Sequence, residues 1–163
     1  MTNIVFSRRH VLAAGGSLLA TTSAPGLLLP ASAAGLAPTP SMSGGSNNYI
    51  KGAKIVDRIG KGGFWMSGTV RRAGDGAPLA RQRIQIWAHT TEGQEHEPQS
   101  HGATLTDKDG KFRLEMPQII PIFGQPHGHL AYDSGEFKTV FLRPVMRSAK
   151  QTSLEAHFIL QPA

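Results

Sequence analysis

Side chains alternate along the stretch Arg83-Ile84-Gln85-Ile86-Trp87-Ala88-His89-Thr90. Successive side chains of a strand point to opposite faces, so Ile84, Ile86 and Ala88 share one face and the residues between them share the other. The same alternation recurs in residues 154–160. Both stretches therefore predict half-buried strands whose apolar faces meet in a core.

Strand-like runs of this kind recur at short spacing through the second half of the chain. They are Phe64 to Arg71, Arg83 to Thr90, Ala103 to Thr106, Lys111 to Met116, His127 to Tyr132, Phe137 to Leu142 and Leu154 to Leu160. Turn residues that suit tight connections lie between them, as in Asp75-Gly76, Asp109-Gly110 and Asp133-Ser134-Gly135. The pattern predicts an all-β fold, an antiparallel β-sandwich of about seven strands.

Composition narrows the function classes. Only 17% of the residues are charged, and glycine (19) and proline (11) are plentiful, which favours a turn-rich domain over a helical bundle. The formal net charge is +6. The Lys and Arg residues are scattered among acids without a basic stripe, so nucleic-acid binding is not expected. There is no cysteine, so a metal would have to be bound by His, carboxylate or Tyr side chains.

The first residues have the features of an export signal. Arg8 and Arg9 directly precede an apolar run over residues 11–29 that is too short and too interrupted to span a bilayer, and Ala31-Ser32-Ala33 suits a signal peptidase. We therefore predict a twin-arginine signal peptide over residues 1–34, export through the twin-arginine translocase, a periplasmic or extracellular location and no stable membrane anchor. Residues 35–62 are predicted to be a flexible linker or arm, and residues 63–163 the sandwich domain.

Several segments of the domain follow one another in a familiar order. They are Ser67-Gly68-Thr69-Val70, Gly76-Ala77-Pro78-Leu79, Ile84-Gln85-Ile86-Trp87-Ala88, residues 105–112 and Pro126-His127-Gly128-His129. This order resembles the intradiol ring-cleavage dioxygenases, the family of protocatechuate 3,4-dioxygenase and catechol 1,2-dioxygenase. The Thr106 to Phe112 turn is also common in transthyretin-like sandwiches. The resemblance implies an intradiol dioxygenase/transthyretin-like sandwich.

The histidine pair is the strongest part of the resemblance, because family members use both histidines of this motif as iron ligands. Residues two apart on a strand project from one face, so His127 and His129 can present two imidazoles to one ion. Gly128 between them is expected to leave the backbone free to approach closely. Two exposed histidines at a strand edge are the alternative.

The chain departs from the family at the two tyrosinate ligands. The first family tyrosine lies eight residues after the tryptophan, where this chain has Glu95, and the glycine two residues earlier is kept as Gly93. The loop before the histidine pair offers Ile122 and Phe123 in place of the second tyrosine. The third ligand is therefore predicted to be Glu95, with His96 and His101 on the same loop as alternatives.

These residues leave the metal and the activity open. The resemblance implies Fe(III), whereas two histidines with one carboxylate suit Fe(II), and several histidines would also suit copper or zinc. We expect an exported metal-dependent dioxygenase-like protein whose partner is a small aromatic substrate, a catechol-type or other phenolic compound. An oligomer is possible. The alternative is a non-catalytic periplasmic β-sandwich that serves as a binding or interaction module.

Overall fold

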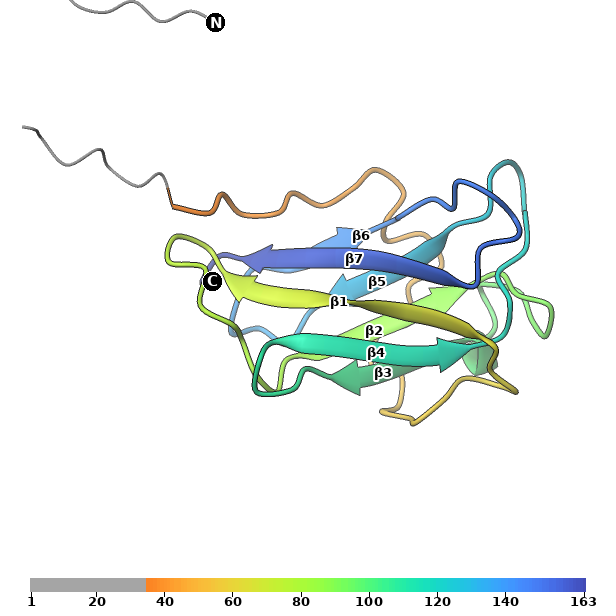
Figure 1. The fold of residues 1–163 in the computed structure, drawn as a ribbon, viewed down its shortest axis with the longest axis horizontal. Coiled ribbons are helices and arrows are strands. Elements are labelled where there is room, and N and C mark those ends of the chain that lie inside the picture. The colour runs from red at the N-terminus through yellow and green to blue at the C-terminus, as the bar shows by residue number, and fades with distance from the viewer. Residues whose placement is uncertain (1–34) are drawn as a thin grey trace, which may run out of the picture. The chain divides into compact units, whose positions relative to one another are not determined.

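Strands make up nearly all the regular structure in the computed structural model, which describes residues 35–163 (Figure 1). They are β1 (Phe64–Arg72), β2 (Arg83–Ala88), β3 (His101–Leu105), β4 (Lys111–Met116), β5 (Gly128–Tyr132), β6 (Val140–Leu142) and β7 (Ser153–Leu160). One short 3-10 helix, Pro98–Ser100, precedes β3. The seven strands overlap the seven predicted runs, and the all-β prediction is confirmed.

The strands form two sheets that pack face to face. One sheet has the order β4-β1-β7 and the other the order β3-β2-β5-β6. Their pairings are antiparallel, apart from the parallel pair β1 and β7. The predicted β-sandwich is therefore the architecture of the domain, with one parallel pair at β7.

Alternation along the strands supplies the core between the sheets. Ile84, Ile86 and Ala88 belong to the buried apolar cluster, as do the inward-facing residues of β7. Trp87 points to the opposite face of β2, yet its exposed fraction is 0%. Something other than the second sheet must therefore cover the outer face of β2.

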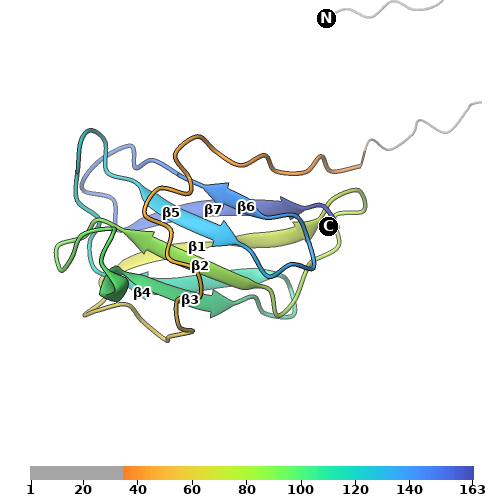
Figure 2. The ribbon, with the colours of Figure 1, turned by 180° about the vertical axis from the view of Figure 1, so that it is seen from behind.

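That cover is the segment 35–62, hereafter the arm. Figure 2 shows the arm passing across β5 and β2 on the outer face of their sheet. Its backbone amides at Thr39 and Met42 donate to the carbonyls of Ile159 and Phe141, at 2.9 and 2.8 Å. The composition of residues 35–62 predicted a flexible linker or arm, whereas its backbone is hydrogen-bonded along the domain. Sheet-edge pairing of this kind needs only backbone groups, so the side-chain pattern gave no sign of it.

The turn between β3 and β4 shows how the loops are fixed. The Asp107 carboxylate accepts hydrogen bonds from the amides of Asp109 and Lys111, at 2.9 and 2.8 Å. Gly110 has φ of 72°, and a Cβ there would lie 2.5 Å from the carbonyl oxygen of Val70. Glycine is therefore required at this predicted tight turn.

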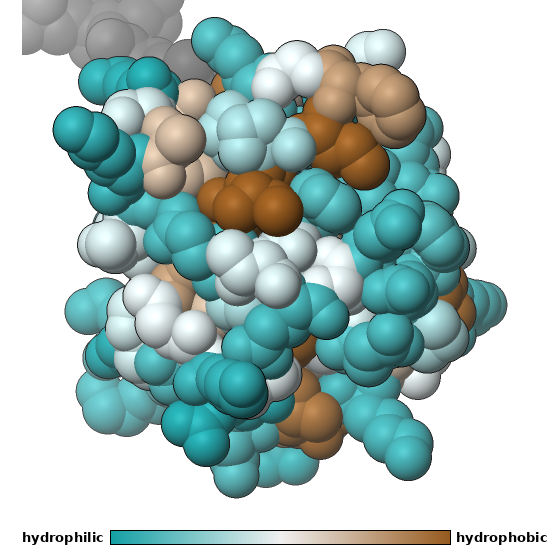
Figure 3. Space-filling model, turned by 90° about the vertical axis from the view of Figure 1, so that its right-hand side faces the viewer, coloured by the Kyte–Doolittle hydropathy of each residue, from teal (hydrophilic) through white to brown (hydrophobic). Residues whose placement is uncertain are grey.

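Figure 3 looks onto the end of the sandwich at the right of Figure 1, where polar residues cover most of the face and apolar residues lie in separate small groups. Within residues 35–163, no helix has the length and apolar character needed to cross a membrane. The predicted twin-arginine signal over residues 1–34 lies outside the described residues.

Candidate metal centre

The histidine pair lies at the start of β5. His127 directly precedes the strand and forms an isolated bridge with Val145, while His129 is paired with Trp87 of β2. Their imidazole rings lie 5.0 Å apart, and their exposed fractions are 6% and 0%. Both side chains lie on one face of the sheet, as the two-residue spacing predicted. This is the outer face, and the two histidines are buried there rather than exposed at an edge.

Gly128 serves the opposite face. A Cβ at this position would lie 2.8 Å from Cε of Met66 and 3.5 Å from Cδ1 of Ile119, both of which belong to the core. The sequence suggested that this glycine allows close approach to a metal. The structure instead shows that it makes room for core side chains.

A loop fixed by hydrogen bonds places Glu95 beside the histidines. After β2 the chain turns at Thr90, whose amide donates to the carbonyl of Gly93 at 2.9 Å. A Cβ on Gly93 would lie 2.6 Å from Oγ of Ser100, so the loop closes on itself at this glycine. The backbone carbonyl of Glu95 accepts a hydrogen bond from Nε2 of His101 at 2.8 Å. These contacts fix the backbone from which the carboxylate extends.

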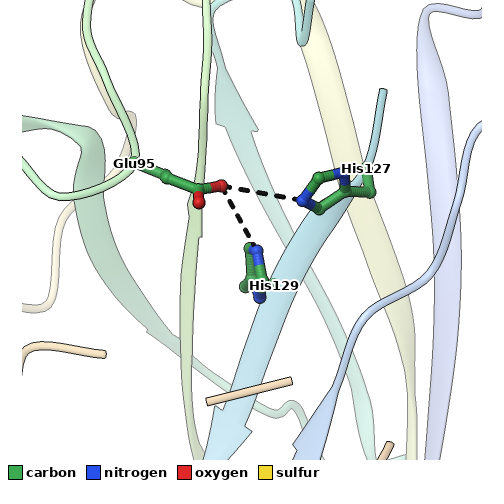
Figure 4. A group of neighbouring side chains, drawn as sticks. All are labelled: Glu95, His127 and His129. Carbon is green, nitrogen blue, oxygen red and sulfur yellow. Dashed lines mark ion pairs between the residues drawn. The ribbon is translucent and has the colours of Figure 1, made fainter. Parts of the chain in front are cut away.

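Glu95, His127 and His129 meet at one point, as Figure 4 shows. Oε2 of Glu95 lies 3.7 Å from Nε2 of His127 and 3.3 Å from Nε2 of His129. The three ligand atoms lie within 4.8 Å of one another. Ligand atoms bound at about 2.0–2.2 Å to one ion lie roughly 3–3.5 Å apart. The distance from Glu95 to His129 falls in this range, and the distance from Glu95 to His127 is slightly longer.

The hydrogen bonds of the two rings show which nitrogen is free. Nδ1 of His127 donates to the carbonyl of Gln125 at 2.8 Å, and Nδ1 of His129 donates to the carbonyl of Gly45 at 3.1 Å. A neutral imidazole with its proton on Nδ1 has a lone pair on Nε2. Both lone pairs therefore face the carboxylate of Glu95, and Oε2 of Glu95 and Nε2 of His129 are buried without a hydrogen-bond partner.

Acceptors that face one another in a buried site need a cation between them. A proton on His129 is disfavoured, because burial lowers the pKa of this imidazole, although its hydrogen bond to Gly45 opposes the shift. A metal ion would satisfy all three ligand atoms at once. The donor set therefore fits a metal ion, and Glu95, His127 and His129 form a possible metal site.

The other two predicted ligands lie elsewhere. His96 is exposed on the loop. His101 is buried, but its Nε2 is used by the carbonyl of Glu95 and its Nδ1 lies 3.4 Å from Nε2 of Gln85. The ring of His101 stacks on Trp87 at 5.4 Å, and His129 stacks on the other side of Trp87 at 5.1 Å. His101 thus orients the loop that carries Glu95, and the structure does not bring it into the triad.

Three contacts of the triad had no signal in the sequence. The carbonyl of Gly45 accepts a hydrogen bond from Nδ1 of His129, and Nδ2 of Asn48 donates one to Oε1 of Glu95 at 2.6 Å. Both residues belong to the arm. Nη2 of Arg143 lies 3.4 Å from Nδ1 of His127, and its Nε is buried without a partner. Arg143 therefore places a cation beside the triad.

The tyrosines do not contribute to this site. The hydroxyl of Tyr49 donates a hydrogen bond to the carboxylate of Asp133. The hydroxyl of Tyr132 accepts one from the amide of Phe137 at 3.2 Å. Burial raises the pKa of both phenols, which favours their neutral forms. Phe123, near the second tyrosine position implied by the resemblance, is fully exposed. Within the described residues, the triad therefore takes its negative charge from Glu95.

Several solved structures of dioxygenases are similar to this chain in fold. The chain superposes on hydroxyquinol 1,2-dioxygenase from Pseudomonas putida DLL-E4 with a TM-score of 0.58 and 12% identity, over 78% of this chain and 68% of that one. For 3-chlorocatechol 1,2-dioxygenase from Rhodococcus opacus 1CP the TM-score is 0.55 and the identity 17%, over 81% and 74% of the two chains. The fold is that of the intradiol dioxygenases.

A third neighbour with the intradiol dioxygenase fold is similar over its whole length. The dioxygenase domain of a dioxygenase and carbohydrate-binding fusion from Streptomyces sp. SirexAA-E gives a TM-score of 0.59 at 15% identity, covering 78% of this chain and 100% of that domain. No family model and no curated protein sequence matches the chain. The fold implied by the resemblance is confirmed, while these identities leave the chemistry to be argued from the site.

Proposed function

We propose that this chain is an exported, metal-dependent protein of the intradiol dioxygenase type that acts on a catechol-type or other phenolic compound. The observation that carries the proposal is the convergence of two imidazole lone pairs and one carboxylate on a single buried point. The dioxygenase fold of its neighbours supports it.

The residues of the triad favour a divalent ion. Two neutral histidines and one carboxylate bring one negative charge to a metal ion, whereas two tyrosinates would bring two. The set with one carboxylate suits Fe(II) with open coordination positions. An ion held there would act as a Lewis acid and as a template for the neighbouring oxygens of a diol. The two Nδ1–H groups, bonded to the carbonyls of Gln125 and Gly45, keep the rings oriented.

Arg143 supplies the positive charge that a phenolic ligand requires. A phenol that binds a metal through oxygen does so most strongly as its anion, and a guanidinium nearby stabilises that anion. The buried Nε of Arg143 has no partner within the described structure, and its Nη2 lies beside His127. Arg143 is therefore the residue that we propose to orient the substrate oxygen.

Oxygen uptake tests this function. The protein is loaded with Fe(II) without air, mixed with catechol-type diols, and then exposed to dioxygen while oxygen consumption and product mass are measured. We expect diol-dependent oxygen uptake and a product heavier than the diol by the mass of dioxygen. Glu95→Ala, treated in the same way, should show neither. Absence of oxygen uptake in protein that carries equimolar iron would contradict the catalytic proposal.

A non-catalytic binding module is the second candidate function, and the position of the cavities favours it. Cavities of about 590 and 510 Å³ open on the described residues, and neither is lined by Glu95, His127 or His129. The arm lies over the triad instead. A non-catalytic metal-binding sandwich would have such a covered metal site, with no cavity for a substrate beside it. It would bind the metal without oxygen uptake, so the same experiment separates the two functions.

Export is the remaining part of the proposal and rests on Arg8 and Arg9. The twin-arginine route is read through the paired guanidinium groups, which Lys does not reproduce. Replacing both residues with Lys should leave the precursor in the cytoplasm, as cell fractionation would show. Unchanged export of the Lys variant would exclude the twin-arginine route.

A further inference from the structure

The arm reaches the metal-binding triad at two points. Gly45 is buried against β6, and a Cβ there would lie 2.9 Å from Cβ of Phe141, so the chain can approach this closely only as glycine. Its carbonyl accepts the Nδ1 proton of His129. This single bond fixes the tautomer of His129 and directs the Nε2 lone pair toward Glu95.

Asn48 holds the other side of the triad. Its Nδ2 donates to Oε1 of Glu95 at 2.6 Å, and Oε2 of the same carboxylate is the atom that faces the two histidines. An amide that occupies one carboxylate oxygen leaves the other directed at the metal position. The carbonyl of neighbouring Asn47 accepts from Nε1 of Trp87 at 2.9 Å, which anchors this part of the arm to β2.

We propose that the arm is part of the metal centre, with Asn48 and the carbonyl of Gly45 as positioning groups, so that metal binding and arm docking stabilise each other. The inference rests on the proposed metal site at the triad. The coupling is reciprocal by necessity: if a docked arm raises the metal affinity, bound metal strengthens the docking of the arm by the same factor.

The chain offers a matched pair of variants for testing this coupling. Asn48 has φ of 56°, a conformation that glycine adopts without strain, so Asn48→Gly removes the amide and leaves the backbone unstrained. Asn47→Gly introduces the same backbone freedom one residue away. It keeps the carbonyl that bonds Trp87 and touches no ligand of the triad.

Zn(II) affinity of the full chain is the first measurement, made by calorimetric titration. Partners of metal ligands contribute about 10- to 100-fold to affinity, so we expect Asn48→Gly to weaken Zn(II) binding by about that factor. Asn47→Gly should bind Zn(II) as the wild type does. Zinc is suitable because it has no redox chemistry that could damage the site.

Tryptic cleavage of the arm is the second measurement. Lys51 and Lys54 are exposed within the arm, and the carbonyl of Lys54 accepts from the amide of Ala103 at 2.8 Å, so cutting after Lys54 requires the arm to open. Zn(II) should slow the cleavage after both lysines in the wild type, and should slow it less in Asn48→Gly. This readout does not depend on any enzymatic activity.

The outcomes separate the two proposals. Wild-type protein that binds no Zn(II) would overturn both the metal site and the coupling. Wild-type protein that binds Zn(II), with equal affinity in Asn48→Gly and no protection of Lys51 and Lys54, would overturn the coupling and leave the metal site standing. Weakened binding in Asn48→Gly alone, together with zinc-dependent protection of the arm, supports the coupling.

Discussion

His101 shows how a histidine near the proposed metal site can contribute without being one of its three ligands. Its Nε2 donates to the carbonyl of Glu95, and its ring stacks on Trp87 within 7° of parallel. Burial lowers the pKa of His101, which keeps the ring neutral, although its bond to Glu95 opposes the shift. Its contribution is to hold in place the loop that carries the carboxylate.

His101→Phe should therefore weaken metal binding without abolishing it. Phenylalanine preserves the stacked ring against Trp87 but removes the hydrogen bond to Glu95, and we expect a loss of about 10-fold in Zn(II) affinity. His96→Ala is the control, since His96 is exposed on the same loop and should have no effect. Complete loss of metal in His101→Phe, in protein that remains folded, would make His101 a ligand.

The sequence could predict the site only where local rules apply. The spacing of His127 and His129 follows from the two-residue period of a strand. A loop has no such period, so Glu95 was preferred to His96 only through the spacing of the family resemblance. The bond between Asn48 and Glu95 joins residues 47 positions apart, and the bond between Gly45 and His129 joins residues 84 apart. No local pattern encodes such contacts.

The parallel pairing of β1 and β7 depends on one small residue. Gly68 lies opposite Ala156 in the register, and a Cβ on Gly68 would lie 1.6 Å from the carbonyl oxygen of Ala156 and 2.7 Å from Cζ of Phe112. The backbone carbonyl cannot move aside without breaking the ladder. The two strands can pair here only because Gly68 has no side chain.

Gly68→Ala should consequently destabilise the domain by about 3 kcal/mol or more, at or above the upper end of the usual cost of overpacking. Chemical denaturation followed by circular dichroism measures this change. Ser67→Ala is the neighbouring control, because it shortens a half-buried side chain and adds no atom. A Gly68→Ala protein as stable as Ser67→Ala would show that the close approach of β1 and β7 is wrong.

The prediction of strands succeeded where one face of a strand is apolar. It failed for strand ends and strand direction, which depend on backbone hydrogen bonds. All seven strands overlap stretches that the sequence marked as strands, and the alternation is clearest in β4 and β7. Strand β6 is shorter than predicted, because only Val140–Leu142 pairs with β5 and residues 137–139 lie before the strand. Strand direction was not encoded either, since alternation is the same in parallel and antiparallel pairs. The parallel pairing of β7 was therefore unpredictable.

For the whole molecule, the core and the triad occupy different places. The buried apolar cluster lies between the two sheets, whereas the triad lies on the outer face of the sheet that contains β5, beneath the arm. A core that is complete without the ion does not need the ion to form. The domain should therefore fold in the absence of metal, unlike a metal-nucleated domain.

Chelation tests this independence. Removing the metal should leave the far-ultraviolet circular dichroism spectrum unchanged. The melting temperature should fall only as far as the lost free energy of metal binding requires. Metal added back should restore the melting temperature. A chelator that unfolds the domain would contradict the separation of core and triad.

Metal content shows whether Glu95, His127 and His129 hold one metal ion. The wild type and His129→Ala are incubated with Fe(II) or Zn(II), passed through a desalting column and analysed for metal by mass spectrometry, with circular dichroism to establish that both are folded. We predict equimolar metal in the wild type and little in His129→Ala. Equal metal content in the two folded proteins, or none in the wild type, would exclude a metal site at the triad.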